Sequence, residues 1–115
     1  MSFWRYLIFG LVLLAVQLPS LGARADMDGA WAAYDRGDYK TAAELFRAEA
    51  EQGNADAQYM MGAISNDGDV GPRDYAAAAG WYAKAAAQGQ ADAQNSLGYL
   101  YDFGLGVPRD QSKAE

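Results

Sequence analysis

Residues 53–62, GNADAQYMMG, recur 36 positions later as residues 89–98, GQADAQNSLG. The match continues downstream, where the triplet Pro-Arg-Asp at 72–74 returns at 108–110. Most of the shared residues are Gly, Pro, Asp, Arg and Gln, so an alanine-rich composition does not explain the match. A fixed period of this length is typical of repeat proteins, in which each unit buries its apolar surface against the next.

The repeated segment has the apolar spacing of a helix. This spacing predicts a helix over residues 55–66 and a copy of it over residues 91–102. Gly62 and Gly98 lie beside the apolar face of these two helices. Because a glycine inside a helix costs about 1 kcal/mol relative to alanine, its recurrence predicts the close approach of a neighbouring helix.

A second helix is predicted in each unit. It begins after an aspartate that follows a turn, at Asp38, Asp74 and Asp110. An aspartate in this position accepts hydrogen bonds from the free N–H groups of the first turn and meets the positive end of the helix dipole. The helix ends at the Gln-Gly pairs of residues 52–53 and 88–89, where glycine takes the left-handed conformation that terminates helices. These aspartates are therefore interpreted as helix caps and not as catalytic acids.

Three segments of the chain resemble the Sel1-like repeat, a relative of the tetratricopeptide repeat. They are residues 91–101 (ADAQNSLGYLY), residues 104–110 (GLGVPRD) and residues 81–89 (WYAKAAAQG). The resemblance implies an all-α protein, a helix-turn-helix solenoid built of Sel1-like and tetratricopeptide-like repeats.

The same resemblance divides the chain into units. Residues 26–53 are expected to form an N-terminal tetratricopeptide-like unit, residues 54–89 a complete Sel1-like repeat, and residues 90–115 a partial repeat with a truncated second helix. Residues 68–71 reverse the Gly-Val order of the loop at residues 104–107. The chain also lacks the cysteine pairs of the exported, cysteine-rich branch of the family, so the penicillin binding linked to that branch is not expected here.

Residues 1–25 are predicted to be a secretory signal peptide. One positive charge precedes an almost uninterrupted apolar run over residues 6–18, and Pro19 and Gly22 are expected to break the helix before the cleavage motif at residues 23–25, Ala-Arg-Ala. The apolar run is shorter than the roughly 20 residues that span a bilayer, which favours cleavage after Ala25 over an uncleaved membrane anchor. The mature protein is therefore expected in the periplasm or outside the cell.

Composition narrows the possible functions. The chain has no cysteine and no histidine, and its formal net charge is -6. The missing side chains remove Ser-His-Asp and Cys-His nucleophilic sites as well as thiolate and imidazole metal sites. The acidic balance argues against nucleic acid, and against a membrane surface after signal cleavage, as the partner. We expect no enzyme activity, no catalytic residue and no cofactor.

The pair Asp67 and Asp69 resembles the start of a calcium-binding loop. Such a loop places a glutamate at its twelfth position, where this chain has Ala78. The pair is therefore interpreted as part of an ordinary polar turn, and no metal site is expected.

The resemblance also implies that the first helix of each unit lines the concave surface of the solenoid. The positions of these helices that lie off the apolar face recur from unit to unit, and the candidate binding residues are Asp56, Tyr59, Asn66, Asp92, Asn95, Tyr99 and Asp102. Tyrosine flanked by Asp and Asn is typical of rigid, amphipathic protein-binding surfaces. The predicted function is an interaction scaffold that binds a protein or peptide on this surface.

Two alternatives stay open on the sequence alone. One is a solvated face that binds nothing. The other is an accessory subunit or enzyme of cell-wall or exopolysaccharide metabolism, which would need an acid/base pair that this segment does not show.

The end of the sequence carries a further expectation. Residues 111–115 supply only the first turn of another second helix, which leaves Leu97, Leu100 and Tyr101 half covered. We expect either that the chain is part of a longer array or that a partner covers this end.

Overall fold

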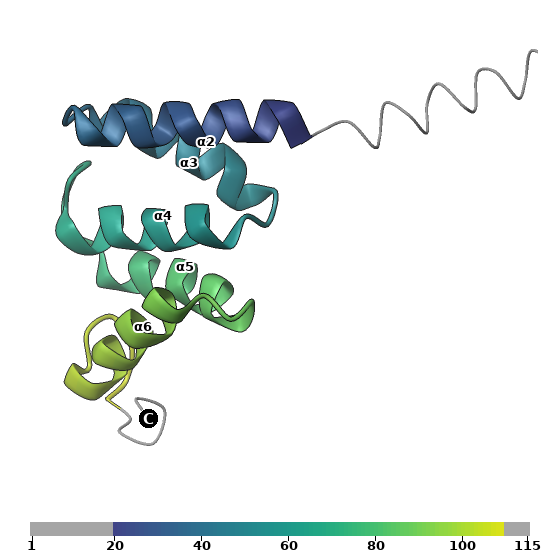
Figure 1. Ribbon diagram of the computed structural model, residues 1–115. Coiled ribbons are helices and arrows are strands. Elements are labelled where there is room, and N and C mark those ends of the chain that lie inside the picture. Colours follow the sequence, from purple (N-terminus) through teal and green to yellow (C-terminus); the bar gives the residue numbers. More distant parts are fainter. Residues whose placement is uncertain (1–19, 110–115) are drawn as a thin grey trace, which may run out of the picture.

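The computed structural model describes residues 20–109, with side chains from residue 26 onward. Figure 1 shows the described helices stacked one after another in chain order. They are α2 (Ser20–Asp35), α3 (Tyr39–Glu51), α4 (Ala55–Asp67), α5 (Tyr75–Ala87) and α6 (Ala91–Phe103). This part of the chain is all-α, as the sequence predicts, and α4 and α6 lie in the same register of successive repeats.

The predicted caps of the second helices are confirmed where the structure describes them. The side chain of Asp38 accepts a hydrogen bond from the Thr41 amide at 3.3 Å, and that of Asp74 accepts one from the Ala77 amide at 2.9 Å. After each of these helices a glycine takes a positive φ, +97° at Gly53 and +89° at Gly89. The predicted cap Asp110 lies outside the described residues.

The first helices have caps of their own that the sequence reasoning did not identify. Asn54 accepts a hydrogen bond from the Ala57 amide at 3.1 Å, and Gln90, at the equivalent position, accepts one from the Ala93 amide at 2.6 Å. An amide oxygen on a side chain satisfies the free N–H groups of the first turn as a carboxylate does. The repeat therefore caps both of its helices from its own sequence.

Buried side chains form two clusters along the stack. The cluster between α2, α3 and α4 includes the fully buried Phe46 with Met61 and Ile64, and the cluster between α5 and α6 includes Tyr82 and Leu100. Alanine fills most of the remaining positions in both clusters, which allows the helices to approach one another closely.

Gly62 lies where α4 and α5 come into contact. A Cβ atom at Gly62 would lie 2.5 Å from two ring carbons of Tyr82, closer than carbon atoms pack. The close approach that the recurring glycine predicts is therefore confirmed at this position.

The N-terminal end of the described chain corrects one expectation. Helix α2 begins at Ser20 and passes through Gly22 and residues 23–25, so the predicted break at Gly22 is wrong. One glycine costs a helix about 1 kcal/mol, which good helix formers on both sides offset.

The described helices do not test the other predictions for the N-terminal and C-terminal ends of the chain. Residues 1–19 of the predicted signal peptide and residues 110–115 of the partial repeat lie outside the described residues. Between residues 20 and 109, no helix is both long enough and apolar enough to cross a membrane.

Candidate functional site

A pocket of about 240 Å³ opens where α4, α5 and α6 meet. The side chains that line it are Asn66, Tyr82, Asn95, Ser96 and Tyr99. We call this the Asn66–Tyr99 pocket, and the side of α4 and α6 on which it opens the first-helix face. The helical register creates the pocket, because residues 95, 96 and 99 of α6 are neighbours on one side of that helix.

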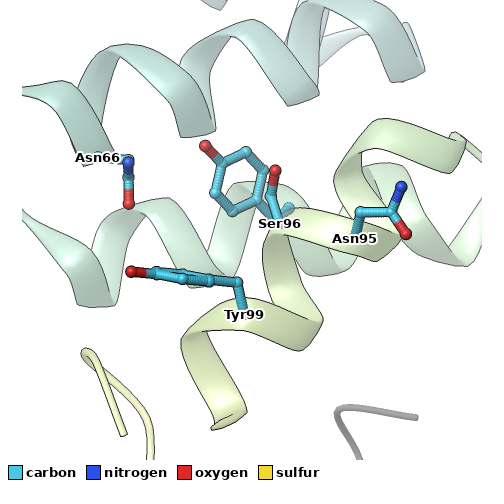
Figure 2. Close-up of a pocket in the computed structure, with 5 residues that line it drawn as sticks. Asn66, Asn95, Ser96 and Tyr99 are labelled. Carbon is cyan, nitrogen blue, oxygen red and sulfur yellow. The ribbon is translucent and has the colours of Figure 1, made fainter. Parts of the chain in front are cut away.

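Figure 2 shows how the labelled side chains are arranged. Tyr99 extends from α6 toward Asn66, Ser96 lies on the preceding turn of the same helix, and Asn95 lies at the other side of the view. The exposed fraction of Tyr99 is 57%, and its ring contacts Phe103 with a centroid distance of 4.6 Å. Tyr99, which lines the pocket, therefore belongs to an exposed aromatic pair on α6 whose other member, Phe103, lies outside the lining.

The inner wall of the pocket is Tyr82 on α5, which is almost fully buried. Burial raises the pKa of Tyr82 to about 12, with smaller contributions from Tyr59 and from the charge of Asp67, and a hydrogen bond with Ser96 partly offsets these effects. At neutral pH the phenol is therefore protonated.

Three of the predicted binding residues, Asn66, Asn95 and Tyr99, come together in the pocket. Tyr59 instead packs against both buried clusters, with its ring 5.7 Å from that of Tyr82, so it is only partly available to a partner. Its position faces α5 because the tight contact at Gly62 draws the two helices together.

The remaining predicted residues lie outside the pocket lining. Asp56 and Asp92 are exposed in the first turns of α4 and α6, where Asp56 accepts a long hydrogen bond of 3.5 Å from the Gln90 side chain. Asp102 is half-buried in the last turn of α6. These carboxylates therefore surround the first-helix face and do not form one cluster.

Sequence reasoning missed two lining residues and one neighbour. Tyr82, Ser96 and Phe103 are not among the binding residues that the sequence predicts, and Tyr82 also packs in the cluster between α5 and α6. Ser96 and Phe103 are three residues before and four residues after Tyr99, so helical spacing from Tyr99 alone would have identified both.

The first-helix face continues toward α2. Burial raises the pKa of Tyr34 on α2, and the nearby charges of Asp69 and Asp67 add to this effect. Burial also raises the pKa of Asp69, with a further contribution from Asp67. The carboxylate of Asp67 at the end of α4 therefore acts on groups on both sides of that helix.

The pocket offers hydrogen-bonding groups that do not titrate near neutral pH: two amides, a hydroxyl and Tyr82 with its raised pKa. Among the described residues, no group of three or more carboxylates comes together as a metal site. The volume is below the roughly 300–1,000 Å³ of pockets that enclose small ligands, so it fits a side chain of a larger partner.

Comparison with known proteins agrees with this architecture. The family model described as Sel1 repeat matches residues 55–90 and 91–115, which is more than half of the chain. A search of curated proteins found no match.

The solved structures similar to the chain include two crystal structures of repeat proteins. A protective antigen of uropathogenic Escherichia coli strains that displays an SLR fold gives a TM-score of 0.73 at 36% identity, over 80% of this chain and 21% of that one. A Sel1 repeat protein from Oxalobacter formigenes gives a TM-score of 0.64 at 33% identity, over 66% of this chain and 58% of that one. The chain thus spans less than two thirds of either relative, and the similarity confirms the solenoid fold.

Proposed function

The chain belongs to the Sel1 repeat family, and from this premise we propose that it is an exported interaction scaffold whose first-helix face binds a segment of another protein. The Sel1 repeat fold is commonly a protein–protein interaction scaffold, and its members generally bind proteins. The family therefore supports the general function, and the proposal concerns the surface and the cellular location.

The observation that carries the proposal is the Asn66–Tyr99 pocket. It combines the exposed ring of Tyr99, which contacts Phe103 beside the pocket, with two amides and a hydroxyl on packed helices. Aromatic side chains supply contact area at low entropic cost, and amides hydrogen bond with both the N–H and the C=O groups of a bound peptide. A rigid surface of this kind orders few groups on binding, which favours affinity.

A selection from a random peptide display library against the full chain tests this function. We expect enriched peptides that bind the parent protein and lose at least about fivefold in affinity with Tyr99→Ala, because an exposed aromatic anchor of an interface contributes more than about 1 kcal/mol. Lys40→Ala, an exposed change on α3, serves as the control and keeps the affinity. Enriched peptides that bind both variants equally well would show that the partner surface lies elsewhere.

The export half of the proposal rests on the signal-like residues 1–25. Intact-mass spectrometry of the protein recovered from a bacterial periplasm is expected to show a chain that begins at Asp26. Recovery of intact Met1 in the membrane fraction would contradict cleavage and indicate an anchor.

A further inference from the structure

Charge is distributed unevenly between the two kinds of helix. Helices α4 and α6 each carry two aspartates and neither a lysine nor an arginine. The second helices α3 and α5 do carry cations, namely Lys40, Arg47 and Lys84, although α3 also carries three glutamates. Neither α4 nor α6 therefore carries a cation that could offset its own two aspartates.

Two of these cations are already engaged with an aromatic side chain. The ammonium of Lys84 lies 4.7 Å from the ring centroid of Trp81, and the guanidinium of Arg47 lies 5.9 Å from the same ring. A cation over a tryptophan ring is attracted by the negative face of the ring. The ion pair that the structure shows within residues 26–109 joins Arg36 to Asp38, so it involves no aspartate of α4 or α6.

The negative charge extends to the edge of the Asn66–Tyr99 pocket. Asp67 directly follows the lining residue Asn66, whose amide donates a hydrogen bond of 3.1 Å to the Asp67 carboxylate. Asp67 also contributes to the raised pKa of Tyr82 inside the pocket and of Tyr34 and Asp69 beyond it. A positive charge brought to this place would be stabilised by the same field.

The pocket itself is suited to a cationic side chain. Tyr99 in the pocket and Phe103 beside it expose 57% and 59% of their surfaces, and the face of such a ring attracts an ammonium or a guanidinium. The oxygens of Asn66, Asn95 and Ser96 accept hydrogen bonds from the same groups. The volume of about 240 Å³ accommodates a single long side chain and leaves the peptide backbone outside.

We propose that the first-helix face recognises a cationic segment of its partner protein, with a lysine or arginine side chain inserted between Asn66 and Tyr99 and further basic residues facing the aspartates of α4 and α6. This inference rests on the proposed function, because it names the chemistry of the segment that the same surface would bind. The charge complementarity and the aromatic pair carry it together.

The composition of the peptides selected from the display library is the first test. We expect lysine and arginine to be enriched among peptides whose binding depends on Tyr99. One such peptide and a copy with glutamate at each basic position are then compared by isothermal titration calorimetry, and the glutamate copy is expected to lose at least about tenfold in affinity, since each reversed charge replaces attraction by repulsion.

Charge-neutral variants locate the interaction. Asp67→Asn is expected to weaken the basic peptide about two- to fivefold, the range measured for exposed ion pairs. Glu44→Gln makes the same change of charge on α3 and is the matched control, with unchanged affinity expected. Raising the salt concentration from about 0.1 M to about 1 M shortens the Debye length from about 10 Å to about 3 Å and should weaken binding to the parent more than to Asp67→Asn.

The possible results separate this inference from the function on which it rests. Peptides that depend on Tyr99 but are acidic or uncharged would overturn the cationic partner and leave the binding surface in place. Equal losses with Asp67→Asn and Glu44→Gln would also overturn it, because they indicate attraction by net charge alone. Peptides that bind independently of Tyr99 would overturn both proposals. Circular dichroism of each variant distinguishes lost binding from lost folding. Asn66→Ala is a second change in the pocket, so that the result does not depend on Tyr99→Ala alone.

Discussion

The first helices α4 and α6 occupy the same place in successive repeats, yet within residues 20–109 α4 packs between α3 and α5, whereas α6 packs mainly against α5. Gln58 and Gln94 show the consequence most clearly. Each donates its side-chain amide to a carbonyl oxygen eight residues earlier, Ala50 at 3.1 Å and Ala86 at 3.2 Å. Gln58 is buried and also accepts a hydrogen bond from Gln88, whereas Gln94 is exposed.

The repeat sequence thus encodes the contact within a unit, and the neighbouring helices decide how much that contact stabilises. Stability in stacked repeats is a sum of terms for each unit and for each interface between units. Equivalent substitutions in α4 and α6 should therefore differ in their effect on stability by the contribution of the interface.

The largest difference is expected between Met61→Ala and Leu97→Ala, which occupy equivalent positions. Met61 is buried in the cluster between α2, α3 and α4, so its truncation should lower the free energy of unfolding by about 2–5 kcal/mol. Leu97 is half-buried, and its truncation should cost about 1 kcal/mol because less apolar surface is lost. Urea unfolding followed by circular dichroism measures both. Equal losses would show that α6 is covered as well as α4.

The loops that follow these helices differ in their packing. In the loop after α6, residues 104–107, Gly106 has a φ of +69° and lies against the backbone of Tyr75 and Ala76 at the start of α5. Leu105 and Val107 of the same loop pack on the cluster between α5 and α6. In the loop after α4, residues 68–71, Gly71 has a φ of +81°, and no atom lies within 4 Å of the place that a Cβ atom at this residue would occupy.

The second prediction contrasts the glycines of these two loops. Gly106→Ala combines left-handed strain of roughly 1–2 kcal/mol with overpacking of at least about 1 kcal/mol against α5, so a loss of about 2–3 kcal/mol is expected. Gly71→Ala carries the strain alone and should cost about 1–2 kcal/mol. Thermal unfolding of the two variants measures the difference, and an equal effect would argue that loop 104–107 does not rest on α5.

Much of the fold could be predicted because the signals are local. The aspartate caps and the terminal glycines each depend on a few neighbouring residues, and the 36-residue period follows from comparing the sequence with itself. The observed bounds of α4 and α6 exceed the predicted ones by a single residue. The reversed Gly-Val order of residues 68–71 is likewise understandable from the structure. The left-handed position moves by one residue to Gly71, and Val70 becomes exposed.

The candidate site was harder to predict, because its members depend on how the helices meet. Tyr59 and Asn95 are equivalent positions of the repeat, yet Tyr59 packs against both clusters and Asn95 lines the pocket. The side chain of Tyr82 reaches the pocket from α5, and periodicity within α6 does not reveal it. The sequence pattern alone does not specify which helix faces are covered by the next helix.

A third prediction sharpens the comparison of the two glutamines. Gln58→Ala removes a buried donor and leaves the Ala50 carbonyl without this partner, so a loss of about 1–3 kcal/mol is expected. Gln94→Ala changes an exposed residue and should stay within about 0.5 kcal/mol of the parent. Hydrogen exchange at the C-terminal end of α3 and of α5 reports the two changes locally. A comparable effect at both positions would mean that the interface adds nothing to this hydrogen bond.

The smallest expected effect at neutral pH concerns Tyr82, whose equivalent in the preceding unit is Phe46, a buried ring that lacks the hydroxyl. Tyr82→Phe removes one hydrogen bond with Ser96 and should cost no more than about 1 kcal/mol at pH 7. The contrast grows in alkali. Since burial raises the pKa of Tyr82 in the folded state to about 12 from its ordinary value of 10.0, the protonated phenol contributes stability that is fully present below pH 10 and is lost as the pH rises toward 12. Urea unfolding at increasing pH should therefore show a steeper loss of stability in the parent than in Tyr82→Phe, and parallel pH profiles would contradict the burial of this hydroxyl.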